Sequence, residues 1–216
     1  MKKFSFASIM LALFSGLIFS QSTDDYEKWE VFAGYTHVRQ VSFSLDTINP
    51  GIPGLPNIGR VNRANVFKEN PGRYNGGIVS GVGNFSRYLG VKGEFSVSTD
   101  KTPFPNIANQ NLKLQNSLYT LMGGIQIKDN TVEKKIKPFA HALAGASVSS
   151  LKITGTSSGF NPIANTTGFS TAFGGGLDIK LSNRIKLRAI QVDYNPIFQS
   201  NSTQHNIRFA TGVVFN

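Results

Sequence analysis

The chain of 216 residues contains no cysteine. We therefore expect neither a lipid anchor, which needs a cysteine at the signal cleavage site, nor an exported fold stapled by disulfides. Charged residues are also few, at 16% of the chain, and the 12 acidic residues are outnumbered by 22 lysines and arginines. A chain without cross-links must hold itself together through core burial or through pairing of its backbone groups.

Long apolar runs are absent after residue 22, so no later window predicts a membrane helix of roughly 20 residues. The one apolar run, residues 4–19, follows Lys2 and Lys3 and leads into small or polar residues. It is short for an anchor helix and has the layout of a secretory signal peptide. We expect a signal peptide over residues 1–22, cleaved after Ser20 or Ser22, and one domain over residues 23–216.

Motifs for metal or cofactor chemistry are also absent. His37, His141 and His205 are far apart and have no cysteine beside them, so no metal-ligand spacing occurs. No phosphate loop or nucleotide fingerprint is present. The glycine run at residues 174–176 lies inside an alternating segment and predicts close strand packing. The sequence therefore predicts no catalytic, cofactor-binding or metal site and no cofactor.

One enzyme hypothesis is a lipid-modifying hydrolase that uses His141 as base. Ser147 and Ser149 share the face of His141 in an alternating segment, but they lie several residues away. A nucleophile and its base must be within hydrogen-bond reach, so we favour a non-enzymatic protein.

The sequence does contain repeated alternation of apolar and polar residues, which is the period of a β-strand. Eight such segments cover approximately residues 29–43, 73–85, 89–98, 112–127, 136–151, 169–181, 185–194 and 206–216. In the sixth, Phe169, Phe173 and Leu177 share one face, while Ser170 and Asp178 share the other. The faces of the second and fifth segments remain open, because glycine and alanine dominate them.

Connections between these segments alternate in length. Short ones follow the second, fourth and sixth segments, and long ones cover residues 44–72, 100–111, 152–167 and 195–205. An outer-membrane barrel has short periplasmic turns and long extracellular loops, whereas a soluble sandwich has no reason for strict alternation. The first loop is the longest and carries Arg60, Arg63 and Lys68.

Further features favour a membrane barrel over a soluble one. Aromatic residues near segment ends fit interfacial girdles: Trp29, Tyr35, Tyr74, Tyr88, Tyr119, Tyr194 and Phe215. The chain ends on an alternating strand whose penultimate residue is aromatic. We expect an all-β fold, an eight-stranded antiparallel up-and-down transmembrane β-barrel in the cell outer membrane of a Gram-negative bacterium. Eight strands leave an interior that side chains just fill.

Charged residues on the polar faces are candidates for the barrel interior: Glu30, Lys92, Glu94, Asp178, Lys180, Asp193 and Arg208. Opposite charges buried together would have to pair. We interpret the set as a structural plug of salt bridges, with an ion gate as the alternative.

Several segments resemble the outer membrane protein β-barrel domain, which is OmpA-like and opacity-porin-like. Residues 29–36 (WEVFAGYT) resemble its first strand and residues 138–145 (PFAHALAG) its fifth. Residues 174–180 (GGGLDIK), with Arg188 and residues 192–194 (VDY), resemble its sixth and seventh. The resemblance implies an eight-stranded barrel with a role in anchoring, adhesion or small-pore activity.

We therefore expect a structural and surface-interaction (adhesion-like) barrel with weak pore activity. The alternatives are a small porin-like channel and a lipocalin-like soluble binding barrel. The formal charge of +10 is spread out, since no basic run exceeds two residues. Expected partners are outer-membrane lipid and lipopolysaccharide, the barrel assembly machinery during insertion, and an extracellular ligand at the loops. We expect no nucleic acid partner and a monomer.

Overall fold

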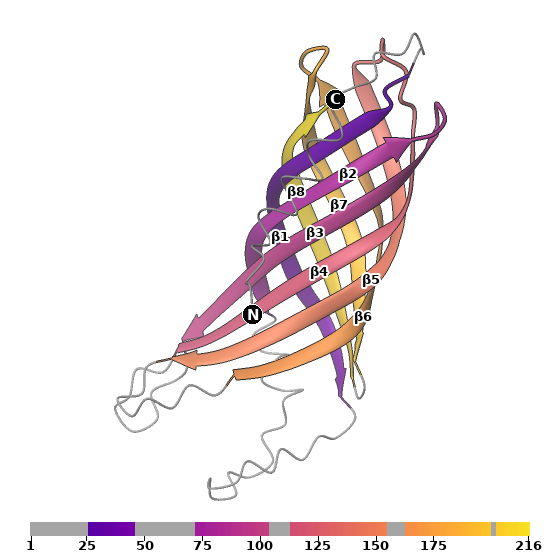
Figure 1. Cartoon of the computed structure of the whole chain (residues 1–216). Coiled ribbons are helices and arrows are strands. Elements are labelled where there is room, and N and C mark those ends of the chain that lie inside the picture. The colour runs from indigo at the N-terminus through magenta and orange to yellow at the C-terminus, as the bar shows by residue number, and fades with distance from the viewer. Residues whose placement is uncertain (1–25, 46–71, 104–112, 155–162, 200–201) are drawn as a thin grey trace, which may run out of the picture.

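The computed structural model describes residues 26–45, 72–103, 113–154, 163–199 and 202–216. The predicted signal peptide lies outside these ranges, as do most residues of the predicted loops. Eight strands follow one another: β1 (Trp29–Leu45), β2 (Arg73–Asn84), β3 (Leu89–Pro103), β4 (Lys113–Lys128), β5 (Ile136–Thr154), β6 (Ile163–Lys180), β7 (Ile185–Gln199) and β8 (Ser202–Phe215). Each pairs antiparallel with its neighbours, and β8 pairs with β1, so the predicted closed barrel is confirmed (Figure 1). In the described ranges, no helix is long and apolar enough to cross a membrane.

The strands are steeply tilted, as the register shows (Figure 1). The row of paired residues that starts at Phe32 in β1 passes through Ser80, Glu94, Met122, Gly145, Ser170, Ile197 and Gln204, and returns to β1 at Phe43. Each row therefore climbs from the end with the short turns towards the end with the long connections. Such a stagger is what closing a tilted sheet requires.

Several strands are longer than the sequence predicted, always on the side of the long connections. β6 begins at Ile163, β7 continues to Gln199 and β8 begins at Ser202. The extra residues are mostly polar, so the apolar alternation fades there, but backbone pairing continues. Hydrogen bonds of a ladder join backbone groups and do not depend on side-chain polarity, which is why pattern alone made these segments too short.

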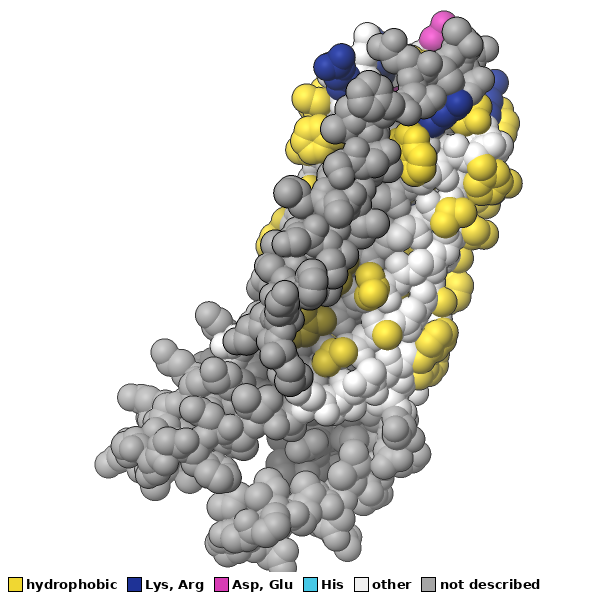
Figure 2. Space-filling model, viewed as in Figure 1, with side chains coloured by type: hydrophobic (Ala, Val, Ile, Leu, Met, Phe, Trp, Pro, Cys, Tyr) yellow, Lys and Arg dark blue, Asp and Glu magenta, His cyan; other side chains and the backbone are white. Residues whose placement is uncertain are grey.

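Sidedness is inverted relative to a soluble barrel. Outward-facing side chains include Leu121 and Ile125, which are 64% and 51% exposed, whereas Lys92 and Asp178 are fully buried inside. Hydrophobic side chains lie along the visible outer surface between the two ends, and Lys and Arg gather at the end with the short turns (Figure 2). An apolar exterior around a charged interior is the arrangement of a transmembrane barrel.

Six of the seven predicted girdle aromatics are exposed on the outside: Trp29, Tyr35, Tyr88, Tyr119, Tyr194 and Phe215. The prediction for Tyr74 is wrong. Tyr74 faces inward and is 3% exposed, and its hydroxyl accepts a hydrogen bond from Asn116 Nδ2 at 2.8 Å. It packs with Val38, Leu118 and Ile197. The glycines that flank Tyr74 in the sequence concealed which face of β2 is apolar.

The structure also assigns the two strands whose faces the sequence left open. In β2, Ile78 and Val82 are buried inside. In β5, Lys137, Phe139 and His141 are buried inside, while the alternate positions are mostly alanine and face outward. The Ala-rich side of β5 is therefore its lipid-facing side.

Inward-facing glycines let neighbouring strands approach closely. A Cβ added to Gly124 would overlap the carbonyl oxygen of Ala142 and lie 2.9 Å from the Cα of Leu143 in the next strand. In the glycine run of β6, a Cβ at Gly174 or Gly176 would likewise overlap the backbone of β7. The run thus serves the close strand packing that the sequence predicted.

This geometry predicts opposite effects at two adjacent glycines. Gly124→Ala should lower the free energy of unfolding by about 1–3 kcal/mol, because the methyl group meets backbone that must shift. Gly123→Ala faces outward, where the nearest atom is Lys92 O at 3.8 Å, and should leave stability unchanged or slightly raised. Urea unfolding, followed by the fluorescence of Trp29, the single tryptophan, measures both. Equal losses in the two variants would contradict this account.

Candidate functional site

The interior holds two groups of charged side chains contributed by most of the strands. The first, the mouth cluster, lies at the end with the short turns and comprises Glu27, Glu30, Lys128, Lys137, Asp178, Lys186 and Arg188. The second, the central cluster, lies further along the barrel and comprises Lys92, Glu94, His141, Asp193 and Arg208.

Lysines join the carboxylates of the mouth cluster in a chain. Lys128 Nζ contacts Glu30 Oε1 at 2.6 Å and Asp178 Oδ2 at 2.7 Å. Lys186 Nζ contacts Glu30 Oε1 at 2.8 Å and also pairs with Glu27, which Lys137 Nζ contacts at 2.7 Å. Each acid thus has two basic partners, which is what buried carboxylates need if they are to remain ionised.

Arg188 connects the mouth cluster to the apolar interior. Its Nε donates to Asp178 Oδ1 at 2.8 Å, and its guanidinium lies 4.3 Å from the ring centroid of Phe32 and 4.1 Å from that of Phe139. Two aromatic faces therefore hold the cation while the carboxylate neutralises it.

The central cluster is charge-balanced when His141 is neutral. Arg208 pairs with Glu94, and its Nη2 contacts Asp193 Oδ2 at 2.6 Å. Lys92 Nζ contacts Glu94 Oε2 at 2.9 Å. His141 Nε2 lies 2.9 Å from Asp193 Oδ1.

Gln191 links the two clusters. Arg188 Nη1 donates to Gln191 Oε1 at 2.9 Å, and Gln191 Nε2 donates to Asp193 Oδ2 at 2.8 Å. Gln191 is fully buried, and so both ends of its amide act inside one continuous network. Such a network is stable only while every member keeps its partner.

The segment before β1 crosses the mouth of the barrel. Tyr26 pairs with Thr131, Glu27 N donates to Asn130 O at 3.2 Å, and Asn84 Nδ2 donates to Glu27 O at 2.8 Å. These bonds hold the Glu27 carboxylate against Lys137. The segment therefore brings an acidic side chain to the mouth of the barrel, where it completes the mouth cluster.

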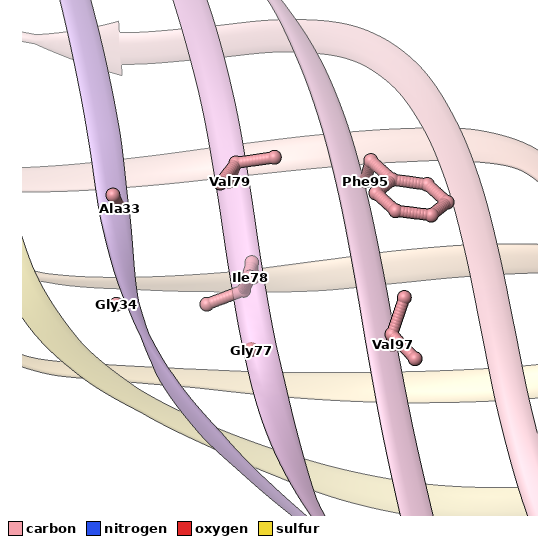
Figure 3. Close-up of a pocket in the computed structure, with 7 residues that line it drawn as sticks. All are labelled: Ala33, Gly34, Gly77, Ile78, Val79, Phe95 and Val97. Carbon is pink, nitrogen blue, oxygen red and sulfur yellow. The ribbon is translucent and has the colours of Figure 1, made fainter. Parts of the chain in front are cut away.

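Beyond the central cluster the described interior is mostly uncharged, although Asp100 lies on the inner face of β3 near Tyr74. Met122, Leu143 and Ala172 pack together, and Asn195 Nδ2 donates to Ser170 Oγ at 2.9 Å beside them. Two hollows lie instead on the outer surface. One is lined by Ala33, Gly34, Gly77, Ile78, Val79, Phe95 and Val97, and Gly77 leaves space there because it faces outward without a side chain (Figure 3). Its apolar lining suits contact with acyl chains.

The structure places six of the seven predicted interior residues inside the barrel, each at most 2% exposed: Glu30, Lys92, Glu94, Asp178, Asp193 and Arg208. Lys180 lies instead at the rim, half-exposed, where its Nζ donates to Val132 O at 2.9 Å. It shares the face of Asp178, but β6 ends at Lys180, beyond the mouth cluster. Whether the set acts as a plug or as a gate stays a prediction.

Sequence reasoning missed Glu27, Lys128, Lys137, Lys186 and Arg188. A bulge in β7 concealed two of them, Lys186 and Arg188, because an extra residue between Arg188 and Gln191 shifts the register of β7 against both β6 and β8. Lys128 could have been identified from the sequence, because it continues the alternation of Met122 and Gln126 on the inner face of β4. No alternation in the sequence indicated that Glu27 faces the interior, because this residue precedes β1.

The three histidines lie apart, as the sequence suggested. His37 contacts Asn75 and His205 contacts Tyr194, both among exposed side chains, while His141 is buried. Among the described residues, no group of acidic and histidine side chains could hold a metal ion. The serines of the hydrolase hypothesis bond elsewhere, since Ser147 donates to Gly168 O and Ser149 to Asn116 Oδ1.

Removing a cation from the central cluster should leave two buried carboxylates without their shared partner. Arg208→Met should lower the free energy of unfolding by about 3–5 kcal/mol, because Glu94 and Asp193 lose their shared partner. Arg184→Met, in an exposed turn, removes the same charge and should cost less than about 0.5 kcal/mol. Urea unfolding of both variants measures the difference.

A double-mutant cycle tests whether the loss comes from the buried pair. Asp193→Asn combined with Arg208→Met should cost less than the sum of the single changes, because the double variant leaves no unpaired charge at this pair. Additive losses would show that the two side chains act independently.

The turn after β4 carries a carboxylate with several donors. Asp129 accepts from Lys134 Nζ and Thr131 Oγ1, both at 2.5 Å, and from Arg87 Nε at 3.2 Å. These hydrogen bonds, that of Lys134 first, hold the pKa of Asp129 well below its usual range. The pKa is therefore lower in the folded than in the unfolded chain, so the stabilisation is present above the ordinary carboxyl pKa of about 4.

Asp129→Asn should accordingly lower the urea midpoint at pH 7, and the difference from the unsubstituted protein should shrink as the pH falls below 4. The difference should be small, because the turn is largely solvated. Unfolding curves at pH 7 and pH 2.5 check the sign. A difference that grows on acidification would contradict it.

No family model and no curated protein sequence matches this chain. Among solved structures, the chain is similar to Ail, the attachment invasion locus protein of Yersinia pestis, in its complex with the heparin analogue sucrose octasulfate. The TM-score is 0.53 at 16% identity, over 88% of this chain and 99% of Ail. Neisserial surface protein A matches with a TM-score of 0.47 at 12% identity, over 89% of this chain and 99% of that protein.

The N-terminal β-barrel domain of Pseudomonas aeruginosa OprF matches with a TM-score of 0.40 at 8% identity, over 88% of this chain and 98% of the domain. At these identities the likeness concerns the fold. The chain thus has the eight-stranded outer-membrane β-barrel fold, as its resemblance to the OmpA-like and opacity-porin-like barrels implies.

Proposed function

We propose that this protein is a non-enzymatic outer-membrane barrel that acts as a structural and surface-interaction scaffold. Its short turns would face the periplasm and its long connections the exterior. The observation that carries the proposal is the inverted distribution of polarity, with Leu121 exposed outside and Lys92 and Asp178 fully buried inside. Only an apolar solvent around the barrel makes this arrangement favourable.

The orientation is supported by the ends of the barrel. β1 begins and β8 ends beside the short turns, where Asn216 N donates to Arg184 O at 3.1 Å. An exported chain that is inserted by the barrel assembly machinery arrives from the periplasm, so we assign this end to the periplasm. The expected signal peptide fits this route.

A lipocalin-like binder would need the opposite sidedness, with an apolar interior large enough for a ligand. Here the described interior is occupied by ion pairs in one half and by packed side chains such as Met122 and Leu143 in the other. The same filling argues against the porin-like alternative. It also leaves the surface role to the connections between long strand ends, because loops on a rigid scaffold usually carry binding.

Cell fractionation together with gel mobility tests the location. We expect the protein in the outer-membrane fraction, with faster mobility before heating than after it, because a closed barrel resists detergent until it is heated. Purified protein should also insert into phosphatidylcholine vesicles and resist protease. Recovery in the soluble periplasm without a heat-dependent mobility shift would refute the proposal.

Planar-bilayer recording tests the scaffold against the pore. We expect no conductance steps from the unsubstituted barrel, because Arg188 and its ring partners block the interior. Regular single-channel steps that scale with the amount of protein would favour the porin-like alternative instead.

A further inference from the structure

Two lysines from strands that are not neighbours converge on one carboxylate at the mouth of the barrel. Lys137 Nζ of β5 contacts Glu27 Oε1 at 2.7 Å, and Lys186 Nζ of β7 pairs with Glu27 Oε2. Both lysine side chains are fully buried, so bulk water is not an alternative partner for either ammonium group. Lys137 and Lys186, here called the lysine cradle, thus offer one cation to each oxygen of a carboxylate.

Glu27 supplies a charge that the rest of the mouth cluster does not replace. Within the described residues, it is the only acidic side chain that contacts Lys137, whereas Lys186 also contacts Glu30 Oε1 at 2.8 Å. Without Glu27, the four cations of the mouth cluster would face only the carboxylates of Glu30 and Asp178. Excess charge buried in a barrel is costly, so a lysine cradle without Glu27 would require another anion.

Glu27 is attached differently from every other member of the mouth cluster. The other members lie on strands, where the ladder of the closed barrel fixes their backbone. Glu27 lies before β1, held by a hydrogen bond to Asn130 O, one from Asn84 Nδ2 and an isolated bridge at the preceding residue. A few hydrogen bonds outside a sheet open at lower cost than the sheet itself. The segment can therefore leave the lysine cradle while Lys137 and Lys186 stay in place.

The lysine cradle lies at the accessible edge of the mouth cluster. The Glu27 side chain is 7% exposed, whereas the side chains of Glu30 and Asp178 are 1% and 0% exposed. Glu27 is thus the most exposed acid of the cluster. Its position is the one that an anion entering from the end with the short turns would reach.

We infer that the lysine cradle is a binding site for a small carboxylate and that Glu27 is its tethered occupant. A free carboxylate takes the place of Glu27 when the segment before β1 is displaced, with one oxygen on each ammonium group. Glu30 shares Lys186, so its negative charge disfavours a doubly charged phosphate at the same site. The inference goes beyond the proposed scaffold role, and only the assignment of the site to the periplasmic side rests on the proposed orientation.

Chemical rescue tests the site in the full barrel, refolded in detergent micelles. Glu27→Ala should bind isotope-labelled acetate saturably in NMR titrations, and its urea midpoint should be higher in sodium acetate than in sodium chloride of equal concentration. The unsubstituted barrel should not bind acetate in the same range, because the tethered Glu27 has a high effective concentration at the site. Glu27→Ala/Lys137→Met should bind acetate roughly thirtyfold more weakly than Glu27→Ala, because the lysine cradle loses one of its two cations.

The matched control is Glu27→Ala/Lys135→Met, because Lys135 is an exposed lysine in the turn before β5. It should bind acetate as Glu27→Ala does. Equal weakening in the two double variants would overturn the inference, as would a urea midpoint that chloride raises as much as acetate. Tighter binding of inorganic phosphate than of acetate would overturn the assignment to carboxylates.

Refolding itself is a second measurement. Refolding of Glu27→Ala in acetate but not in chloride would support the site, and failure in both salts would overturn it, because acetate would then not replace the lost carboxylate. Cell fractionation decides the membrane location independently, so that a failure of the site and a failure of the proposed function are told apart.

Discussion

Complete pairing of the backbone is the constraint on which the rest of this structure depends. A strand in lipid has no water to satisfy its N–H and C=O groups, so the sheet must close on itself. The barrel closes through the pairing of β8 with β1. Because the strands are staggered, the row of paired residues that starts at Phe32 returns to β1 at Phe43. Inward glycines such as Gly124 and Gly174 follow from the same requirement, since a side chain there would push neighbouring strands apart.

Because apolar side chains face outward in this barrel, its charged side chains are buried in the interior. Eight strands enclose too little space for bulk water, and so the inward-facing ions must neutralise one another. The mouth cluster and the central cluster do so, with Gln191 as the bridge and Arg188 held between two rings. Glu27 shows that the requirement extends beyond the strands. It comes from the segment before β1, yet it pairs with Lys137 and Lys186.

The outer face is less uniform than an apolar band needs to be. Stacked aromatic side chains, such as Phe169 with Phe198, lie on β6 and β7, whereas Arg39 of β1 and Arg73 of β2 lie opposite each other. Two sides of one barrel therefore present different chemistry to the same bilayer.

The sequence by itself determined the fold class, because alternation with period two and alternating connection lengths are local properties of the chain. It also identified most of the inward charges, since residues such as Lys92 and Asp178 share a face with other polar residues within their own strands. Tertiary structure decided the rest. A bulge in β7 shifts the face on which Arg188 and Lys186 lie, and local periodicity cannot reveal a register set by the neighbouring strands. Sidedness of the glycine-rich and alanine-rich strands, the inward turn of Tyr74, the entry of Glu27 and the meeting of Arg39 with Arg73 all depend on which strands become neighbours when the barrel closes. Pairing across a closed sheet joins residues far apart in the chain, and this is the information that a linear pattern does not contain.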